Sequence, residues 1–382
     1  MKSKSLMFGA MCLGAMTLYA CNGGSYTPTS SYNYNTLLNG NYQVHQVGDA
    51  GAGAVTETVR VDLTADGTGA GTMNIAAGNH SAGATGSGTY SYTVAADRTF
   101  SVTTTTGTVH GIISVTGNPF VLTDTNRTVS AVPPEDAGVV MAVGMKKTSG
   151  LTNAILNGNY QIHQAGDALL GAGLYTTRVD VTANGAGAGT WTIVGHSAGS
   201  TGTGAYTYSV NAIDGTFSMT TAAGTDYGIV SADGSMFALT DTNPPADTDA
   251  EIVMAVGVKK SSGLTNAVLR GGYQIHQVGK GAAGRYTSRV NITADGAGSG
   301  TWSIASHSAG DTGSGLFTYS VAPDGTFSVT TKDATGTITI GTDYGIVSAD
   351  GSMFAITDTN PTASAVPPIE DAEIILAVGV KK

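Results

Sequence analysis

The stretch that decides the fold is Leu38-Asn39-Gly40-Asn41-Tyr42-Gln43-Val44-His45-Gln46, and it returns twice with small changes. The second copy is residues 156–164 (LNGNYQIHQ), and the third is residues 269–277 (LRGGYQIHQ). Successive tyrosines in this stretch lie 118 and 113 residues apart. These intervals have the size of a domain and exceed the 20 to 50 residues of a solenoid repeat. The sequence therefore predicts three tandem modules, each with its own core.

The ends of the copies are also alike, because residues 142–147, 255–260 and 377–382 share one pattern that closes on two lysines. Short linkers rich in Ser, Thr and Gly separate the copies. We expect the following boundaries: repeat 1 at 37–147, repeat 2 at 154–260 and repeat 3 at 267–382.

Each copy reads as a series of short strands with period-two alternation. In the second copy the expected strands begin near Asn159, Tyr175, Gly189, Ala205, Thr216, Tyr227, Met236 and Ile252. The expected inward face consists of Tyr160, Ile162, Val179, Val181, Trp191, Ile193, Tyr206, Tyr208, Val210, Phe217, Met219, Phe237, Leu239, Met254, Val256 and Val258. The other face carries Thr, Ser, Arg and Asp and is expected to face solvent.

Three connections contain residue pairs that favour tight hairpins, namely Asn184-Gly185, Asp214-Gly215 and Asp233-Gly234. Neighbouring strands are therefore expected to be antiparallel. Eight such strands can close on themselves and remove the exposed edges. The expected fold class is all-β, with three tandem eight-stranded antiparallel up-and-down barrels. A six-bladed β-propeller is the alternative.

A single transmembrane barrel of 24 strands fits less well, because its lipid-facing surface would carry Arg178 and Asp180. The ends of each copy resemble the calycin group, which includes lipocalins and avidins. The resemblance rests on Gly40-x-Tyr42, Gly158-x-Tyr160 and Gly271-x-Tyr273 in the first strand, where the family has Gly-x-Trp, and on a basic residue at the end of the last strand. It implies that Lys146, Lys259 and Lys381, or their neighbours, pack across the first-strand rings.

The N-terminus carries two lysines and then an apolar run from Leu6 to Leu18, which predicts a signal peptide over residues 1–20. The following segment, Leu18-Tyr19-Ala20-Cys21, resembles the lipobox of bacterial lipoproteins. That resemblance implies lipidation at Cys21, a membrane partner through this lipid, and a place in the outer membrane or at the cell surface. Residues 21–36 are expected to be a flexible tether.

The composition excludes some classes of function. The net charge is −10 and only 12% of residues are charged, without the clustered Lys and Arg of a nucleic-acid-binding protein. The mature chain retains one cysteine of the two, so its stability depends on burial and not on disulfides.

Polar residues recur in the connections expected at one end of each barrel, which we call the open end. Such residues can form a ligand-binding rim. The candidate rim residues are His45, His80, Ser81 and Asp124 in the first copy, His163, His196, Ser197, Asp226 and Asp241 in the second, and His276, His307, Ser308, Asp343 and Asp358 in the third.

The alternative is that these residues build turns and recur because the module was duplicated. A catalytic triad is not indicated, since each serine directly follows its histidine and no nucleophile elbow is present. The spacing matches no compact metal motif, and no cofactor is expected.

The sequence therefore predicts a non-enzymatic surface lipoprotein that displays three barrels, joined at their tight-turn ends, for a structural or partner-binding role. A surface protein or a glycan is a candidate partner. The alternative function is that of a carrier of a small apolar ligand inside the barrels. In that case a cavity is expected behind the open-end loops, whereas interiors filled by their own aromatic rings would exclude it.

Overall fold

The computed structural model describes residues 32–49, 56–125, 140–168, 173–242, 251–281, 284–337, 339–359 and 374–382. These residues contain twenty-four strands and three short 3-10 helices, joined by turns and loops. The helices η1 (Tyr34–Leu37), η2 (Asn153–Ile155) and η3 (Asn266–Leu269) each precede the first strand of a barrel.

The strands form three groups of eight. The first barrel contains β1 (Asn39–Asp49), β2 (Thr56–Asp66), β3 (Ala70–Ile75), β4 (Gly86–Val94), β5 (Thr99–Thr103), β6 (Thr108–Ile113), β7 (Phe120–Asp124) and β8 (Val140–Lys146). The second contains β9 (Asn157–Ala168), β10 (Gly173–Asn184), β11 (Ala188–His196), β12 (Thr203–Val210), β13 (Thr216–Thr220), β14 (Thr225–Val230), β15 (Met236–Thr240) and β16 (Glu251–Lys259). The third contains β17 (Gly271–Gly281), β18 (Gly284–Ala294), β19 (Ser299–His307), β20 (Ser314–Val321), β21 (Thr326–Lys332), β22 (Thr339–Val347), β23 (Met353–Thr357) and β24 (Ile374–Lys381).

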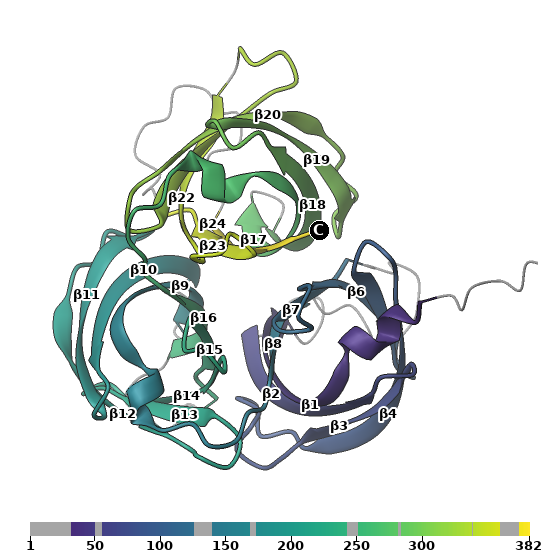
Figure 1. The fold of residues 1–382 in the computed structure, drawn as a ribbon, viewed down its shortest axis with the longest axis vertical. Coiled ribbons are helices and arrows are strands. Elements are labelled where there is room, and N and C mark those ends of the chain that lie inside the picture. Colours follow the sequence, from purple (N-terminus) through teal and green to yellow (C-terminus); the bar gives the residue numbers. More distant parts are fainter. Residues whose placement is uncertain are drawn as a thin grey trace, which may run out of the picture. The chain divides into compact units, whose positions relative to one another are not determined.

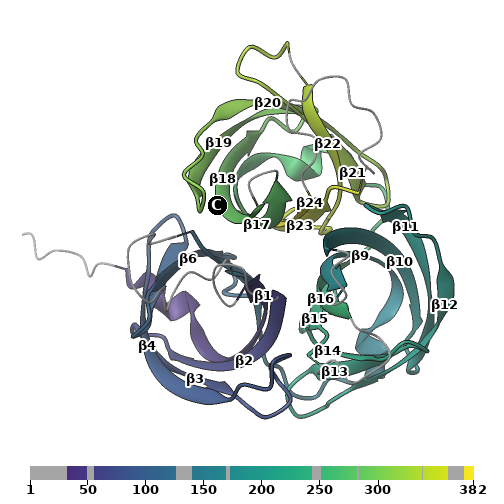
Figure 2. The same ribbon diagram turned by 180° about the vertical axis from the view of Figure 1, so that it is seen from behind.

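Each group closes into an antiparallel barrel, as Figures 1 and 2 show from opposite sides. The first strand of each barrel pairs with both the second and the eighth strand, so the sheet has no free edge. The predicted up-and-down barrels are confirmed, and the propeller alternative is wrong. Each strand of the second barrel begins within two residues of its predicted start.

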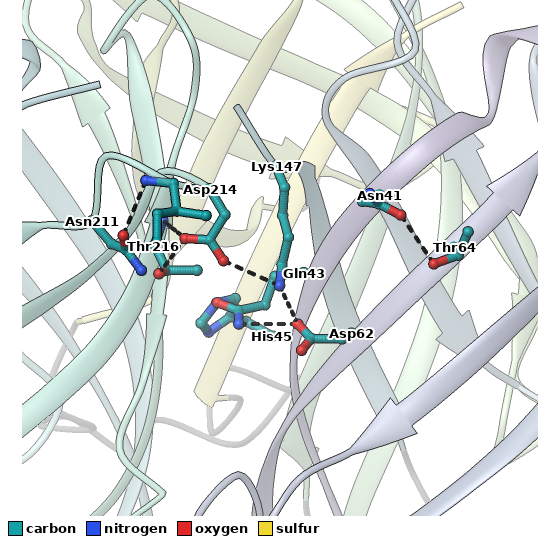
Figure 3. Close-up of polar contacts among 10 residues, drawn as sticks. Asn41, Gln43, His45, Asp62, Thr64, Lys147, Asn211, Asp214 and Thr216 are labelled. Atoms are coloured by element: carbon teal, nitrogen blue, oxygen red, sulfur yellow. Dashed lines mark hydrogen bonds and ion pairs between the residues drawn. The ribbon is translucent and has the colours of Figure 1, made fainter. Parts of the chain in front are cut away.

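Glycines at positive φ make the tight turns of the second barrel. Gly185, Gly215 and Gly234 have φ of 73°, 75° and 68°, a region that residues with a Cβ rarely adopt. The residue before the second of these glycines, Asp214, accepts hydrogen bonds from the backbone N–H of Thr216 at 3.2 Å and from its hydroxyl at 2.7 Å (Figure 3). The turn is thus fixed by local hydrogen bonds as well as by backbone conformation.

Aromatic rings inside each barrel pack on glycines of neighbouring strands. In the second barrel the rings of Phe217 and Phe237 meet edge to face at 5.6 Å, and Phe237 covers Gly257 so closely that a Cβ there would overlap the ring. Tyr160 completes this cluster at 5.5 Å from Phe237. The other two barrels repeat the arrangement.

The basic residue at the end of each barrel lies over the first-strand tyrosine, as the calycin resemblance implies. Lys259 Nζ lies 5.7 Å from the centre of the Tyr160 ring. The corresponding distances are 6.0 Å for Lys146 and 5.7 Å for Lys381. This packing ties the last strand to the first, where the barrel closes.

The predicted inward face of the last strand is wrong. Met254, Val256 and Val258 point away from the barrel interior into a separate hydrophobic cluster, while Val253 and Ala255 belong to the interior core. The physical reason is that β16 is buried on both faces, so its apolar run contains no alternation that marks the interior.

That separate cluster, which we call the central core, takes residues from all three barrels. Its members are Val47, Ile112, Val121, Met141, Val143, Met145, Ala165, Ile229, Met236, Ala238, Met254, Val256, Val258, Val278, Ile346, Met353, Ala355, Leu376, Val378 and Val380. The contacts between barrels run in a cycle: β1 and β2 meet β15 and β16, β9 and β10 meet β23 and β24, and β17 and β18 meet β7 and β8. The three barrels within residues 34–382 therefore share a fourth core outside their interiors.

Candidate functional site

The recurring first-strand histidine lies between two barrels. His45 is fully buried, with Nδ1 3.1 Å from the hydroxyl of Thr240 in the second barrel and Nε2 3.0 Å from Oε1 of Gln43. The Gln43 amide in turn donates to Asp62 at 3.3 Å (Figure 3). Because an amide oxygen only accepts hydrogen bonds, we assign the imidazole proton to Nε2, and Nδ1 then accepts from the threonine.

The other two barrels repeat this contact. His163 Nδ1 lies 3.0 Å from the hydroxyl of Thr357, and His276 Nδ1 lies 2.9 Å from the hydroxyl of Thr123. Burial, with a smaller contribution from a nearby arginine, lowers the pKa of all three histidines from 6.5 to about 3. They are therefore neutral at physiological pH, as a buried imidazole must be unless it has an acidic partner.

These three histidines do not lie in the open-end loops where the sequence interpretation placed them. His45, His163 and His276 lie within strands β1, β9 and β17, at positions that face away from the barrel interior. The face they occupy is covered by the next barrel. Their role in the structure is to hold adjacent barrels together.

The aspartates of the recurring Thr-Asp-Thr-Asn segment lie at the same interfaces. The backbone carbonyl of Asp241 accepts a hydrogen bond from the hydroxyl of Thr58 in the first barrel. The corresponding contacts are Thr176 to Asp358 and Thr287 to Asp124. At each interface a threonine hydroxyl of one barrel thus donates to the aspartate carbonyl of a neighbouring barrel, which explains why these residues recur. The final Asn of each segment lies outside the described residues.

The face predicted to be solvated is also part of these interfaces. The guanidinium of Arg178 lies 4.1 Å from the centre of the Tyr344 ring in the third barrel, and that of Arg60 lies 4.2 Å from the Tyr227 ring in the second. At the third interface the sequence has His110 in place of the tyrosine. The prediction that this face meets solvent is therefore wrong for these arginines.

The last lysine of repeats 1 and 2 forms ion pairs that join two barrels. Lys147 lies 2.9 Å from Asp62 of the first barrel and 3.3 Å from Asp214 of the second (Figure 3). Lys260 repeats the contact between the second and third barrels, at 2.9 Å and 3.4 Å. The C-terminal end of one repeat thus contributes to docking on the next.

The predicted His-Ser pairs build turns. The hydroxyl of Ser197 accepts the backbone N–H of Thr176 at 3.0 Å, and Nδ1 of His196 accepts the N–H of Ala198 at 2.9 Å. The same bonds are made by the serines and histidines of the other copies, Ser81, Ser308, His80 and His307. Each serine oxygen is therefore engaged with the backbone.

The third barrel encloses a cavity of about 430 Å³. Aromatic side chains form much of its wall, namely Tyr286, Trp302, Phe317, Phe327 and Phe354. The Trp302 ring covers Gly315 of the next strand, and its indole N–H donates to the carbonyl of Lys332 at 3.1 Å, which fixes the ring along the wall. A cavity of this volume is within the range of sites for small organic molecules.

A few polar side chains also line the cavity: Gln277, Ser288, His307, Asp311 and Asp343. Ser288 is 1% exposed, and its hydroxyl has no hydrogen-bond partner among the described residues. A buried hydroxyl without a partner costs free energy, about 1 to 3 kcal/mol, so a ligand that satisfies it gains affinity.

His307 is held in a defined orientation at the open end of this cavity. Its ring stacks on Tyr286 with centroids 4.6 Å apart, and Nδ1 accepts a backbone N–H. The nearest oxygen of Asp311 lies 3.5 Å from the same nitrogen. Burial lowers the pKa of His307, an effect that Asp311 partly opposes. The imidazole is therefore neutral at pH 7, and its proton is on Nε2.

Two of the predicted rim residues, His307 and Asp343, thus line the cavity of the third barrel. The second barrel has matching residues. Asp226 is the cross-strand neighbour of the interior residue Met219, and His196 stacks on a tyrosine at 5.0 Å. A void of about 10 Å³ lies beside Tyr206 and other aromatic rings of this barrel.

The first barrel differs at the open end. Glu57 occupies the position of Tyr286, and Oε2 of this glutamate lies 3.4 Å from Nε2 of His80. Val109 occupies the position of Asp343, and Met73 that of Trp302. The three interiors are therefore chemically distinct even though the barrels share one topology.

Sequence reasoning missed Ser288 and Gln277 as site residues. Their signal was available, because period-two alternation along β18 puts Ser288 on the same face as Val290 and Ile292. A polar residue among apolar ones on an inward face indicates a site that needs a partner.

Among the described residues, no three His, Cys, Asp or Glu side chains gather in a way that could hold a metal ion. The described residues also contain no helix long and apolar enough to span a membrane. The predicted signal peptide and Cys21 lie outside the described residues.

No family model and no curated protein sequence matches this chain. Among solved structures, the chain is similar to transferrin binding protein B from serogroup B Neisseria meningitidis, with 8% identity over 90% of this chain and 76% of that one and a TM-score of 0.28. A transferrin binding protein B variant from Haemophilus parasuis gives 9% identity, 89% and 75% coverage and a TM-score of 0.27. A protein of the DUF3598 family from Nostoc punctiforme gives 9% identity, 59% and 98% coverage and a TM-score of 0.21. None of these similarities is close enough to transfer a function.

Proposed function

We propose that this chain is an exported, lipid-anchored envelope protein that binds a small, largely apolar ligand, with the third barrel as its main site. The observation that carries the proposal is the cavity of about 430 Å³ inside that barrel. An eight-stranded barrel is wide enough to hold one small ligand when its own side chains do not fill it. A purely structural or partner-displaying role requires no such cavity.

The wall of the cavity supports a binding role. Trp302, Phe317 and Phe354 supply apolar contact area, while the polar groups are few and lie at defined positions. This combination, an apolar pocket with a few polar groups that fix orientation, is typical of small-molecule sites.

We further propose that binding is not followed by chemistry. The serine that follows each recurring histidine accepts a backbone N–H, as Ser197 does from Thr176, which holds the hydroxyl in the turn. Nδ1 of His196 is likewise engaged with the backbone. Hydrolysis of ester or amide substrates that is lost in a variant combining His80→Ala, His196→Ala and His307→Ala would contradict this part of the proposal.

The cavity can be tested with N-phenyl-1-naphthylamine, whose fluorescence rises in apolar surroundings. We expect the mature chain to bind the probe saturably. Val329→Trp should reduce binding at least about tenfold, because Val329 lines the cavity and a larger ring would fill it. Thr318→Trp is the matched control, since Thr318 is exposed on the outer face of β20. Binding that is absent, or equal in all three proteins, would overturn the proposal.

The lipid anchor has a separate test. Cells that express the chain and are fed labelled palmitate should incorporate label into the protein, and Cys21→Ser should abolish the incorporation. A soluble, unlabelled protein in the periplasm or medium would show that Cys21 is not an anchor.

A further inference from the structure

We propose that the ligand of the third barrel is an uncharged molecule with an apolar body and a carbonyl group, and that its carbonyl oxygen accepts hydrogen bonds from Ser288 and the polar neighbours of this serine on the inner wall. This inference rests on the proposed ligand-binding function and adds the chemical class of the ligand.

Three polar side chains form a row across adjacent strands of the cavity wall. Ser288 on β18 is the cross-strand partner of Gln277 on β17 and of His307 on β19, and all three line the cavity. Cross-strand partners on one face have Cβ atoms about 4.5 to 5.5 Å apart, so one ligand atom can reach more than one of them. The wall beside the row is apolar, with Ile275 and Val290 next along the same strands.

The hydroxyl of Ser288 is at the centre of this row. The residue is 1% exposed, and its hydroxyl has no hydrogen-bond partner in the part of the chain that the structure describes. The large majority of buried polar side-chain atoms have such a partner. Thr177 occupies the same position in the second barrel, where it is 2% exposed and its hydroxyl likewise lacks a partner among the described residues. A hydroxyl that is retained in two copies by different residue types points to a partner from outside the chain.

His307 supplies a second donor. Its Nδ1 accepts the backbone N–H of Ala309, and burial lowers the pKa of the imidazole. The neutral ring therefore carries its proton on Nε2. The side-chain amide of Gln277 adds further N–H donors. Because a carbonyl oxygen has two lone pairs and no proton to donate, it matches a row in which hydroxyl, imidazole and amide can all donate.

The charges of the cavity wall disfavour an ionised head group. Among the described residues that line the cavity none is Lys or Arg, so a carboxylate would lose its hydration without gaining a cation. The Asp343 carboxylate already has an interaction within the protein, and the side chain of Asp311 is 72% exposed, so solvent screens its charge. An ammonium group would therefore lose its hydration without gaining a free buried carboxylate. An uncharged ligand avoids both costs.

The first barrel is a natural comparison. Val59 occupies the position of Ser288 there and belongs to the interior core of that barrel. The carbonyl site is therefore expected in the third barrel and not in the first.

The experiment uses four ligands of nearly the same shape: 4-phenyl-2-butanone, its hydrocarbon counterpart isopentylbenzene, 3-phenylpropanoate and the ammonium form of 4-phenyl-2-butylamine. Each displaces N-phenyl-1-naphthylamine from the mature chain at pH 7.5, and the displacement that remains in Val329→Trp, whose third cavity is filled, is subtracted. We expect the ketone to bind at least about tenfold more tightly than either ion.

Variants test the role of the hydroxyl, because the hydrocarbon gains more than the ketone from leaving water and the two affinities are not directly comparable. Ser288→Ala should weaken ketone binding roughly tenfold and leave isopentylbenzene within about twofold. Ser320→Ala is the matched control, since Ser320 is exposed on the outer face of β20, and it should change neither affinity.

A thermal melt without ligand separates a binding role from a structural one. The hydroxyl of Ser288 has no partner among the described residues, so Ser288→Ala should not lower the melting temperature. A lower melting temperature would show that the hydroxyl serves the fold and would overturn the inference.

The two proposals fail in different ways. If the probe binds but an ion binds more tightly than the ketone, or if Ser288→Ala leaves ketone binding unchanged or weakens the hydrocarbon equally, the carbonyl inference is wrong and the ligand-binding function stands. If neither the probe nor any of the four ligands binds, both proposals are wrong.

Discussion

Acid should loosen the docking of the three barrels, and the effect follows from the interface histidines. His45, His163 and His276 are fully buried with both ring nitrogens in hydrogen bonds. In the unfolded chain an imidazole has a pKa near 6.5, whereas burial lowers the pKa of these three to about 3. Between these two values the unfolded or separated state binds protons that the docked state does not.

The sign and size of the effect follow by linkage. Stability is fully present above pH 6.5 and falls as the pH drops toward 3, because protonation favours the state in which the imidazoles reach water. At pH 5 the shifted pKa of each histidine lowers the free energy of unfolding by about 2 kcal/mol, and the three together lower it by about 6 kcal/mol. When all three histidines take up a proton on unfolding, the free energy of unfolding changes by about 4 kcal/mol per pH unit, which is the steepest slope expected.

The assay is urea denaturation at several pH values between 7.5 and 5, followed by circular dichroism and by the hydrodynamic radius. A variant with Gln at all three positions keeps polar side chains but cannot titrate, so most of its pH dependence should disappear. Thr240→Val is the control, because it removes a partner of His45 but leaves the imidazole. It should lower stability at every pH and keep the slope.

A slope that is the same in the triple variant and in the unmodified chain would refute this reasoning. It would mean that other groups dominate between pH 7.5 and 5, or that the histidines already reach water in the native protein.

Three further substitutions test the packing. Gly257→Ala places a Cβ against the Phe237 ring and should destabilise the second barrel by about 1 to 3 kcal/mol, whereas Gly86→Ala, with open space around the new Cβ, should have little effect in the same thermal melt. Lys147→Met removes two partly exposed ion pairs with aspartates of adjacent barrels, so its cost should be below about 1 kcal/mol and should vanish in 1 M salt. Arg178→Lys should weaken the stacking on a tyrosine of the third barrel and lower the urea midpoint, while an unchanged midpoint would show that the contact contributes nothing.

The fold of each module was predictable because the signals are local. Period-two alternation and the Asn-Gly and Asp-Gly pairs fix strand positions and turn types independently of the rest of the chain. Strand starts such as Thr216 and Met236 therefore agree with the structure.

The faces of β16 were not predictable by alternation. Residues 252–258 form an apolar run, and such a run indicates burial without saying which side is the interior. Gly257 holds the missing information, since an inward glycine makes room for the ring of Phe237, but that pairing is visible only once the strands are adjacent.

The interfaces between barrels depend on long-range contacts and were missed for the same reason. Nothing near His45 in the sequence indicates that its side chain contacts Thr240, which lies 195 residues further along the chain. The exact recurrence of His and of Thr-Asp-Thr in every copy was a usable signal, because a cyclic arrangement of three copies imposes the same contact three times.

The candidate site was predictable in part. Sequence reasoning selected His307 and Asp343, which line the cavity, and also selected residues that hold turns or interfaces. The cavity itself depends on the volumes of side chains from all eight strands and on their rotamers, so no local pattern reveals it.

The most direct test of the functional account is a crystal structure of the protein with N-phenyl-1-naphthylamine. We predict electron density for the bound probe inside the third barrel, beside Trp302 and Phe327. An interior closed by its own side chains, or a probe bound only on the outer surface, would contradict the account.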